Sequence, residues 1–135
     1  MIAIKNVEKK SGHCIIKRTF EVTLPSGTKN IVQHLHCPTW QDMLGGDPRV
    51  LIELVQSIEA TENPKIPIVI HCSAGIGRTG TLIAAADVNY QLTINPQKPI
   101  ALLATIMQLR HQRYGAVQTQ QQIEMLLNFI ARKQY

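Results

Sequence analysis

The sequence has few aromatic residues and no long hydrophobic run. Only 4% of its 135 residues are Phe, Trp or Tyr, too few for the stacking platform of proteins that bind single-stranded nucleic acid. No apolar segment approaches the roughly 18 residues that a membrane-spanning helix needs. The first residues, Met-Ile-Ala-Ile-Lys-Asn, lack the apolar core of a signal peptide. We therefore expect no membrane span, no nucleic-acid partner and a cytoplasmic location.

Cysteine is also scarce. The three cysteines, Cys14, Cys37 and Cys72, form no Cys-x-x-Cys pair. An odd number of cysteines without a secretory signal argues against a disulfide framework and indicates a reducing compartment. His34 and His36 share one face of a predicted strand, but a metal site needs further ligands, so a packed or half-exposed strand face is favoured. We expect neither a metal nor a cofactor.

The residues that are present have the composition of a globular domain with a basic excess. Hydrophobic residues make up 44% of the chain and charged residues 17%, and 14 basic residues against 9 acidic ones give a formal charge of +5. A chain of this length fits one domain with its own core. The basic charge favours anionic partners, but it does not distinguish nucleic acid, lipid and phosphorylated protein.

The hydrophobic pattern predicts a single α/β domain over residues 1–135, with a mixed central sheet flanked by helices. Strand-forming runs at 13–24 and 30–36, broken at Pro25-Ser26-Gly27, predict an antiparallel hairpin, and residues 2–7 predict a third strand. The β-branched run at 66–70 predicts a buried strand. Helical spacing of apolar residues predicts four helices, which run from Asp47-Pro48 to near Asn63-Pro64, from about 80 to 92, over 99–113, and from about 119 to 130.

Residues 71–80, His-Cys-Ser-Ala-Gly-Ile-Gly-Arg-Thr-Gly, bring a nucleophile, an anion cradle and a cation together. Between a strand and a helix, the backbone N–H groups of 73–78 turn toward one centre, and the helix N-terminus adds its positive end. The same field favours the thiolate of Cys72. Arg78 can bind two oxygens of a phosphoryl group at once. The segment therefore predicts a site for a tetrahedral oxyanion beside a reactive thiol.

Two other interpretations of this segment are disfavoured. Residues 75–80 also match Gly-x-Gly-x-x-Gly, but a dinucleotide site expects an acidic residue about 20 positions later, at the end of a second strand. The sequence has no Asp or Glu between Val88 and Ile123. A tight turn around a buried cysteine would explain neither His71 nor Arg78.

The segment resembles the signature of the tyrosine-specific, cysteine-dependent protein phosphatases, with the signature loop between a strand and a helix. Residues 36–42, His-Cys-Pro-Thr-Trp-Gln-Asp, resemble the mobile acid loop of that family, and residues 109–119 resemble the segment leading into its glutamine loop. The order and spacing of the three segments agree as well. The resemblance implies a protein-tyrosine phosphatase that acts through a phosphocysteine intermediate on proteins containing phosphotyrosine, without a cofactor.

The resemblance also implies a role for each matching residue. Cys72 would attack phosphorus, Arg78 and the loop amides would hold the equatorial oxygens, and Asp42 would protonate the leaving phenolate. Gln118 would position the attacking water. The other expected members of the site are Trp40 and Gln41 at the acid-loop hinge, His71 and Thr79 beside the nucleophile and the arginine, Ser73, Ala74, Gly75, Ile76 and Gly77 in the phosphate-binding loop, and Gly115 and Gln122 at the pocket rim, together with Arg110 and Arg113.

Departures from the family pattern leave two functions open. Gln41 replaces the usual proline of the acid loop, and the chain begins where the second half of a family member would begin. The resemblance therefore leaves three alternatives for the aromatic loop that clamps phosphotyrosine and the acidic residue that braces Arg78: they are absent, other residues replace them, or the chain is a truncated member. The chain is either an active phosphatase or a module of low turnover that binds phosphorylated partners. The intact catalytic set favours the enzyme.

Overall fold

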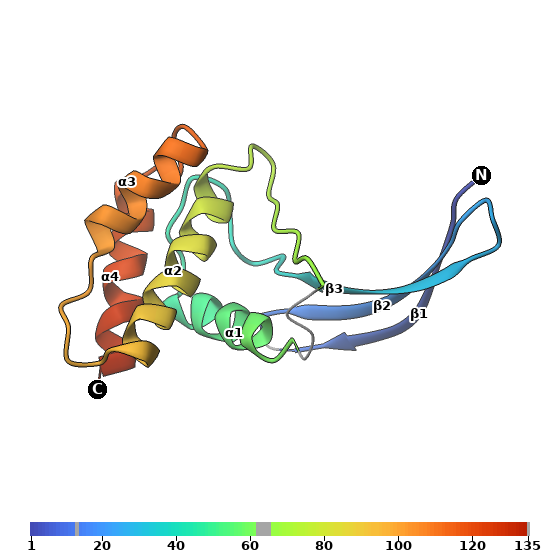
Figure 1. The fold of residues 1–135 in the computed structure, drawn as a ribbon, viewed down its shortest axis with the longest axis horizontal. Helices are drawn as coiled ribbons and strands as arrows, with labels where there is room; N and C mark the ends of the chain where they lie inside the picture. The colour runs from blue at the N-terminus through green and yellow to red at the C-terminus, as the bar shows by residue number, and fades with distance from the viewer. Residues whose placement is uncertain (13, 62–65, 135) are drawn as a thin grey trace. The chain divides into compact units, whose positions relative to one another are not determined.

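The computed structural model describes residues 1–12, 14–61 and 66–134. Contacts divide the chain into two compact units, Met1–Thr39 and Trp40–Tyr135, so the single domain over 1–135 stays a prediction. The described residues form three strands, all in the first unit, and four helices, all in the second (Figure 1). The predicted α/β class is confirmed.

The first unit is an antiparallel sheet. Its strands are β1 (Ala3–Ser11), β2 (Ile16–Thr23) and β3 (Lys29–His36), in the order β1-β2-β3. A turn at Gly27, where φ is +84°, joins β2 to β3, as the Pro-Ser-Gly break predicts. The hairpin and the third strand are therefore confirmed, although His13, in the predicted strand 13–24, lies outside the described residues.

His34 and His36 both lie beside one arginine of the neighbouring strand. Nη1 of Arg18 is 3.4 Å from Nδ1 of His34 and 3.3 Å from Nδ1 of His36. The two imidazoles also stack, with ring centroids 6.0 Å apart. Both rings therefore have a partner on the strand face.

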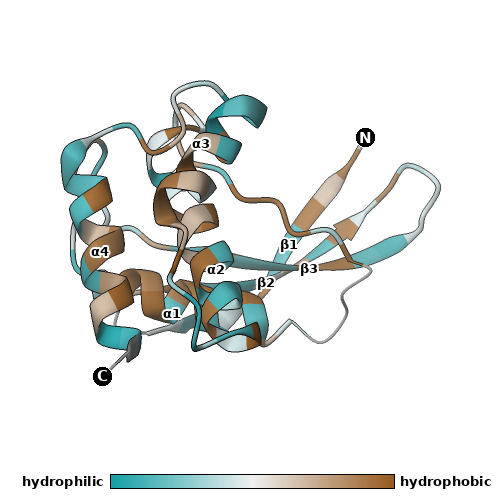
Figure 2. Ribbon diagram, turned by 60° about the vertical axis from the view of Figure 1, so that its left-hand side comes forward, coloured by the Kyte–Doolittle hydropathy of each residue, from teal (hydrophilic) through white to brown (hydrophobic). Residues whose placement is uncertain are grey.

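The second unit is a helical cluster built around α2. Its helices are α1 (Pro48–Glu59), α2 (Gly77–Ile94), α3 (Leu102–Gln112) and α4 (Gln120–Gln134). Helix α2 packs against each of the other three, and small buried residues such as Ala84 and Ala85 allow a close approach. Hydrophobic and hydrophilic residues are interspersed along the helices (Figure 2). The largest fully buried apolar side chains here are Leu51, Val55, Val88, Val117, Leu126 and Phe129.

Helix α1 begins where the sequence predicts. Oδ1 of Asp47 accepts a hydrogen bond from the backbone N–H of Arg49 at 2.9 Å, and Pro48 occupies the first helical position. Hydrogen bonds from the Arg49 side chain and backbone lower the pKa of Asp47 to about 2. The helix ends at Glu59, and the predicted end near Asn63-Pro64 lies outside the described residues.

The prediction of a buried strand at 66–70 is wrong. These residues have no regular secondary structure, and the side chains of Ile66, Ile68 and Val69 are 58%, 49% and 83% exposed. A β-branched run becomes a strand only when a neighbouring strand accepts and donates its backbone hydrogen bonds, and the described part of Trp40–Tyr135 contains only helices. The signature loop therefore follows an irregular segment.

Among the described residues, none of the helices combines the length and hydropathy required to cross a membrane.

Candidate active site

The segment from Cys72 to Arg78 curls around the sulfur of Cys72 and leads into α2. The backbone N–H of Gly75 points at that sulfur, 3.2 Å away. Gly75 has φ +70°, a conformation that residues with a Cβ rarely adopt. Helix α2 starts at Gly77, so the positive end of the helix lies at the end of the loop.

Hydrogen bonds in this loop stabilise the thiolate of Cys72. Burial is the largest single influence on the thiol and opposes ionisation, but hydrogen bonds from the Thr79 side chain and from the backbone N–H groups of Thr79, Gly75 and Ile76 outweigh it. The pKa of Cys72 therefore lies below its ordinary value. The Thr79 residue is itself buried, at 8% exposure.

Arg78 holds the acid loop. Its Nη1 donates to the backbone carbonyl of Trp40 at 3.1 Å, and its Nη2 lies 3.1 Å from Oδ1 of Asp42. The Arg78 side chain is 24% exposed and the Asp42 side chain 53%. The Nε–H of Arg78 is buried and has no partner among the residues described.

Trp40 stabilises the acid loop and the residues that follow it, 43–46, through a hydrogen bond and packing. The indole Nε1–H donates to the carbonyl of Leu44 at 3.0 Å, and the ring is 6% exposed. Gly46 lies beside the ring with φ +94°, where a Cβ would come within 3.4 Å of Trp40 Cδ1. Met43 also has a positive φ, 64°, which a residue other than glycine adopts at a cost in free energy. Packing around Trp40 holds the loop in this shape.

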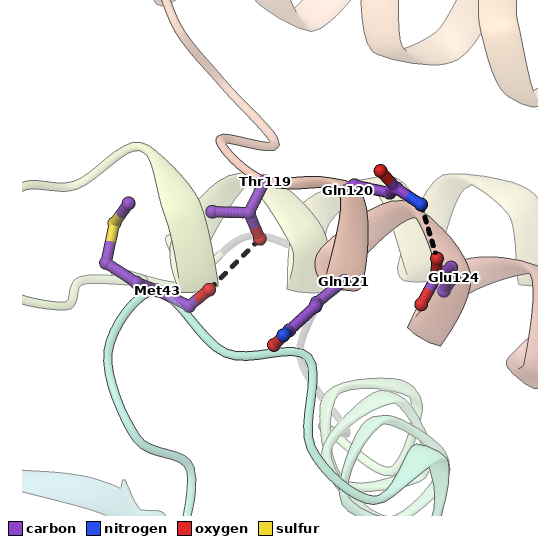
Figure 3. Close-up of a pocket in the computed structure, with 5 residues that line it drawn as sticks. All are labelled: Met43, Thr119, Gln120, Gln121 and Glu124. Atoms are coloured by element: carbon purple, nitrogen blue, oxygen red, sulfur yellow. Dashed lines mark hydrogen bonds between the residues drawn. The ribbon is translucent and has the colours of Figure 1, made fainter.

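The start of α4 anchors the same loop. Thr119 Oγ1 donates to the carbonyl of Met43 at 3.1 Å, and the backbone N–H of Gly45 donates to Oε1 of Gln121 at 3.4 Å. Figure 3 shows the Thr119 contact beside a pocket lined by Met43, Thr119, Gln120, Gln121 and Glu124. The pocket lies between the acid loop and α4, and Cys72 does not line it.

Two glutamines lie against the signature loop. Oε1 of Gln122 accepts hydrogen bonds from the backbone N–H groups of Gln118 and Thr119, at 2.8 and 3.3 Å. A Cβ at Gly77 would come within 2.9 Å of Nε2 of Gln122 and 3.0 Å of Oε1 of Gln118. Both side-chain amides therefore reach the loop at Gly77. Gln122 is fully buried, and its Nε2 has no partner in the part of the chain that the structure describes.

The segment before Gln118 also contacts the loop. The backbone N–H of Val117 donates to the carbonyl of Ile76 at 3.1 Å, and Nη2 of Arg113 donates to the carbonyl of Ala74 at 3.2 Å. Arg110 instead donates to the carbonyls of Ala116 and Val117, at 2.9 and 2.8 Å. Arg113 therefore touches the signature loop, and the Arg110 guanidinium fixes the segment behind it.

The structure thus brings most of the predicted residues together, from three separate segments. Gln41, His71, Ser73 and Ala74 are exposed, and the buried members are Trp40, Gly77, Thr79 and Gln122. The sequence gives no sign of the Arg78–Asp42 ion pair, because the two residues are far apart in the chain. The Thr119 and Gln121 anchors were missed for the same reason. Within the described ranges, no cluster of three or more His, Cys, Asp or Glu residues could hold a metal ion.

Comparison with known proteins gives consistent matches. The sequence profile of the protein-tyrosine phosphatase family matches residues 1–132. Over 124 residues, the chain is 33% identical to tyrosine-protein phosphatase 69D of Drosophila melanogaster, covering 85% of this chain and 8% of that protein. Over 111 residues, it is 36% identical to human tyrosine-protein phosphatase non-receptor type 5, covering 78% of this chain and 19% of that protein.

Solved structures give the same fold. A protein tyrosine phosphatase of Trypanosoma brucei superposes with a TM-score of 0.90 at 22% identity, over 98% of this chain and 49% of that one. The catalytic domain of human protein tyrosine phosphatase non-receptor type 18 superposes with a TM-score of 0.87 at 28% identity, over 99% of this chain and 49% of that one. The chain therefore spans about half of these solved chains and a smaller share of the two curated relatives.

Proposed function

Because this chain belongs to the protein-tyrosine phosphatase family, we propose that it hydrolyses phosphotyrosine in protein substrates through a phosphocysteine intermediate. One observation supports this most directly. Among the described residues, two buried N–H donors of the candidate site, Arg78 Nε and Gln122 Nε2, have no partner. Buried polar atoms in folded proteins nearly always have a hydrogen-bond partner, from protein, water or a bound group, and a phosphoryl group carries the oxygens that two N–H donors require.

In the first step, the Cys72 thiolate attacks phosphorus. The S–P bond forms as the bond from phosphorus to the phenolic oxygen breaks, and Asp42 gives its proton to the departing phenolate. The lowered pKa of Cys72 supports this role, because only the thiolate is an effective nucleophile.

In the second step, water attacks the phosphocysteine. Asp42, now a carboxylate, takes a proton from that water, the S–P bond breaks, and inorganic phosphate leaves. Gln118 orients the water, and Gln122 holds the backbone of Gln118 through the 2.8 Å hydrogen bond. Thr79 stabilises the returning thiolate, since its hydroxyl already favours that charge state.

Charge on the transferring group is held by Arg78 and the loop amides. As negative charge spreads over the equatorial oxygens, the guanidinium and the N–H groups of 73–78 stabilise it. Oδ1 of Asp42 lies 3.1 Å from Nη2 of Arg78 and is paired with the guanidinium. A bound phosphoryl dianion takes over that ion pair, and the Trp40 carbonyl keeps the arginine in place during the exchange.

The formal charge of +5 supports an anionic protein substrate, because a basic surface raises the rate of encounter with phosphorylated segments. The thiol chemistry supports a cytoplasmic location, since Cys72 must stay reduced to act as a nucleophile.

An aryl phosphate assay of the wild type beside Cys72→Ser and Asp42→Ala tests the proposal. We expect no turnover by Cys72→Ser, and a loss of about 10²–10⁴-fold in Asp42→Ala. Equal background rates of hydrolysis in all three proteins would overturn the proposal that the chain is a hydrolase. Tight phosphopeptide binding by the same inactive wild type would then indicate a binding module.

A further inference from the structure

Residues Arg113 to Ala116 form a tight turn with Tyr114 at its corner. The backbone N–H of Ala116 donates to the carbonyl of Arg113 at 3.1 Å, and Gly115 has φ +77° while Tyr114 keeps a negative φ. This combination is typical of a type II turn with Gly at its third position. Tyr114 occupies the second position, at the outer corner.

This turn sits on the signature loop. Arg113 Nη2 donates to the carbonyl of Ala74, and a Cβ at Gly75 would lie 3.6 Å from the same nitrogen. A Cβ at Gly115 would lie 3.6 Å from Cδ1 of Ile76. The residues on both sides of Tyr114 therefore contact the loop that surrounds Cys72.

The backbone of the turn is fixed from behind. Arg110 donates to the carbonyls of Ala116 and Val117, and the N–H of Arg113 donates to the carbonyl of Leu109 at 2.7 Å. Because both ends of the turn are held, the position of Tyr114 relative to the loop is set before any ligand binds, which reduces the entropy cost of using it.

The ring of Tyr114 is itself unpacked, with the residue 93% exposed. Trp40 and Phe129, by contrast, are buried, and Tyr90, which is 62% exposed, belongs to α2, well after the loop. A large aromatic side chain that is presented on a rigid corner and left without packing is suited to cover a ligand rather than the core.

We propose that Tyr114 is a specificity-determining residue that stacks on the aryl ring of the substrate whose phosphate lies in the signature loop. The inference rests on the proposed function and adds a residue that selects aryl over alkyl phosphates. Phosphate oxygens bind the loop itself, so the contribution of Tyr114 concerns only the ring.

The test compares binding in a Cys72→Ser background, where turnover does not interfere. A phosphotyrosine peptide, the same peptide with phosphoserine, and inorganic phosphate are titrated against Cys72→Ser alone and with Tyr114→Ala, Tyr114→Phe or Tyr90→Ala. We expect Tyr114→Ala to weaken phosphotyrosine binding by roughly 2–12-fold, the range for one aromatic pair. Affinities for phosphoserine peptide and inorganic phosphate should not change. Tyr114→Phe and Tyr90→Ala should bind as the parent does.

Three results would overturn the inference, and they differ in what they say of the proposed function. If phosphotyrosine peptide binds equally well to Tyr114→Ala while the wild type hydrolyses aryl phosphates, the stacking role is wrong and the phosphatase stands. If the Cys72→Ser parent binds no phosphotyrosine peptide, both are wrong. A parallel loss for inorganic phosphate would also contradict stacking, since it would show that the loop itself had changed.

Discussion

Arg78 and Asp42 form an ion pair across the candidate site, with Nη2 of the arginine 3.1 Å from Oδ1 of the aspartate. One side chain is the proposed ligand of the phosphoryl group and the other the proposed acid. Each therefore neutralises the other until an anion arrives. The pair also gives Arg78 an acidic partner from within this chain, in line with the expectation that another residue could replace the usual bracing acid.

Replacing the aspartate separates its two roles. Asp42→Asn should lower the turnover of an aryl phosphate by about 10²–10⁴-fold, because the general acid is lost. The same variant should bind inorganic phosphate more tightly, because no carboxylate competes for Arg78 or repels the anion. Steady-state kinetics with phosphate as a competitive inhibitor measures both effects. Weaker phosphate binding would mean that Asp42 positions Arg78 instead of competing for it.

The reactivity of Cys72 should depend on Thr79. Because hydrogen bonds lower the pKa of the folded thiol, alkylation of Cys72 by iodoacetamide should reach half its maximal rate at a lower pH than alkylation of the unfolded chain. Thr79→Ala should move that midpoint upward, since a hydroxyl that favours the thiolate is removed. Mass spectrometry of the Cys72 peptide follows this thiol separately from Cys14 and Cys37. An unchanged midpoint in Thr79→Ala would leave the backbone N–H groups as the cause.

The lowered pKa of Cys72 also determines in which direction the stability of the protein changes with pH. A thiol whose pKa is lowered by folding adds stability as pH rises through the folded pKa, and the gain is complete above the pKa of the unfolded thiol. It is lost as pH falls through the folded value. Cys72→Ser removes this contribution, so the urea unfolding free energies of the wild type and the variant should diverge progressively as pH rises from the folded pKa of Cys72 toward the pKa of the unfolded thiol. Equal pH dependence of the two proteins would contradict the lowered pKa.

Alanine substitutions of two glycines in α2 should have different effects, one on turnover and the other on stability. A Cβ at Gly77 meets the ends of two glutamine side chains, whereas a Cβ at Gly80 would lie 2.7 Å from the backbone nitrogen of Val117. Side-chain ends can move and backbone cannot. We expect Gly77→Ala to fold well but to lose on the order of tenfold in turnover, through displaced Gln118 and Gln122. Gly80→Ala should lose about 1–3 kcal/mol of stability.

Thermal unfolding and the aryl phosphate assay together distinguish the two glycine variants. The reverse pattern, an unstable Gly77→Ala or a stable and inactive Gly80→Ala, would contradict these assignments.

The anchor between Thr119 and the acid loop should matter for turnover. Thr119→Val removes the hydrogen bond to the carbonyl of Met43, at a cost of about 0.5–1.5 kcal/mol. Turnover should fall several-fold, because the loop then spends less time in the conformation that places Asp42 beside Arg78. Thr61→Val is the matched control, since its hydroxyl donates to the Ser57 carbonyl at the end of α1. Equal turnover of the two variants would argue against the anchor.

Features that depend on adjacent residues could be predicted from the sequence, whereas contacts between distant segments could not. The turn at Gly27 and the start of α1 at Asp47-Pro48 follow from the conformations and hydrogen bonds of adjacent residues. The segment 66–70 is apolar and β-branched, but it can form a strand only if another segment pairs with its backbone, which its own sequence does not reveal. The Arg78–Asp42 pair likewise depends on how two distant segments meet.

The first turn of α4 and the two residues before it connect the two half-reactions of the proposed mechanism. Thr119 and Gln121 hold the loop that carries the proposed proton donor Asp42, and Gln118, directly before Thr119, carries the amide that we propose orients water. In the proposed mechanism, formation and breakdown of the phosphocysteine therefore both depend on the same helix end. Substitutions there should slow both half-reactions by a similar factor. The fraction of enzyme in the phosphocysteine form at steady state then stays constant while turnover falls.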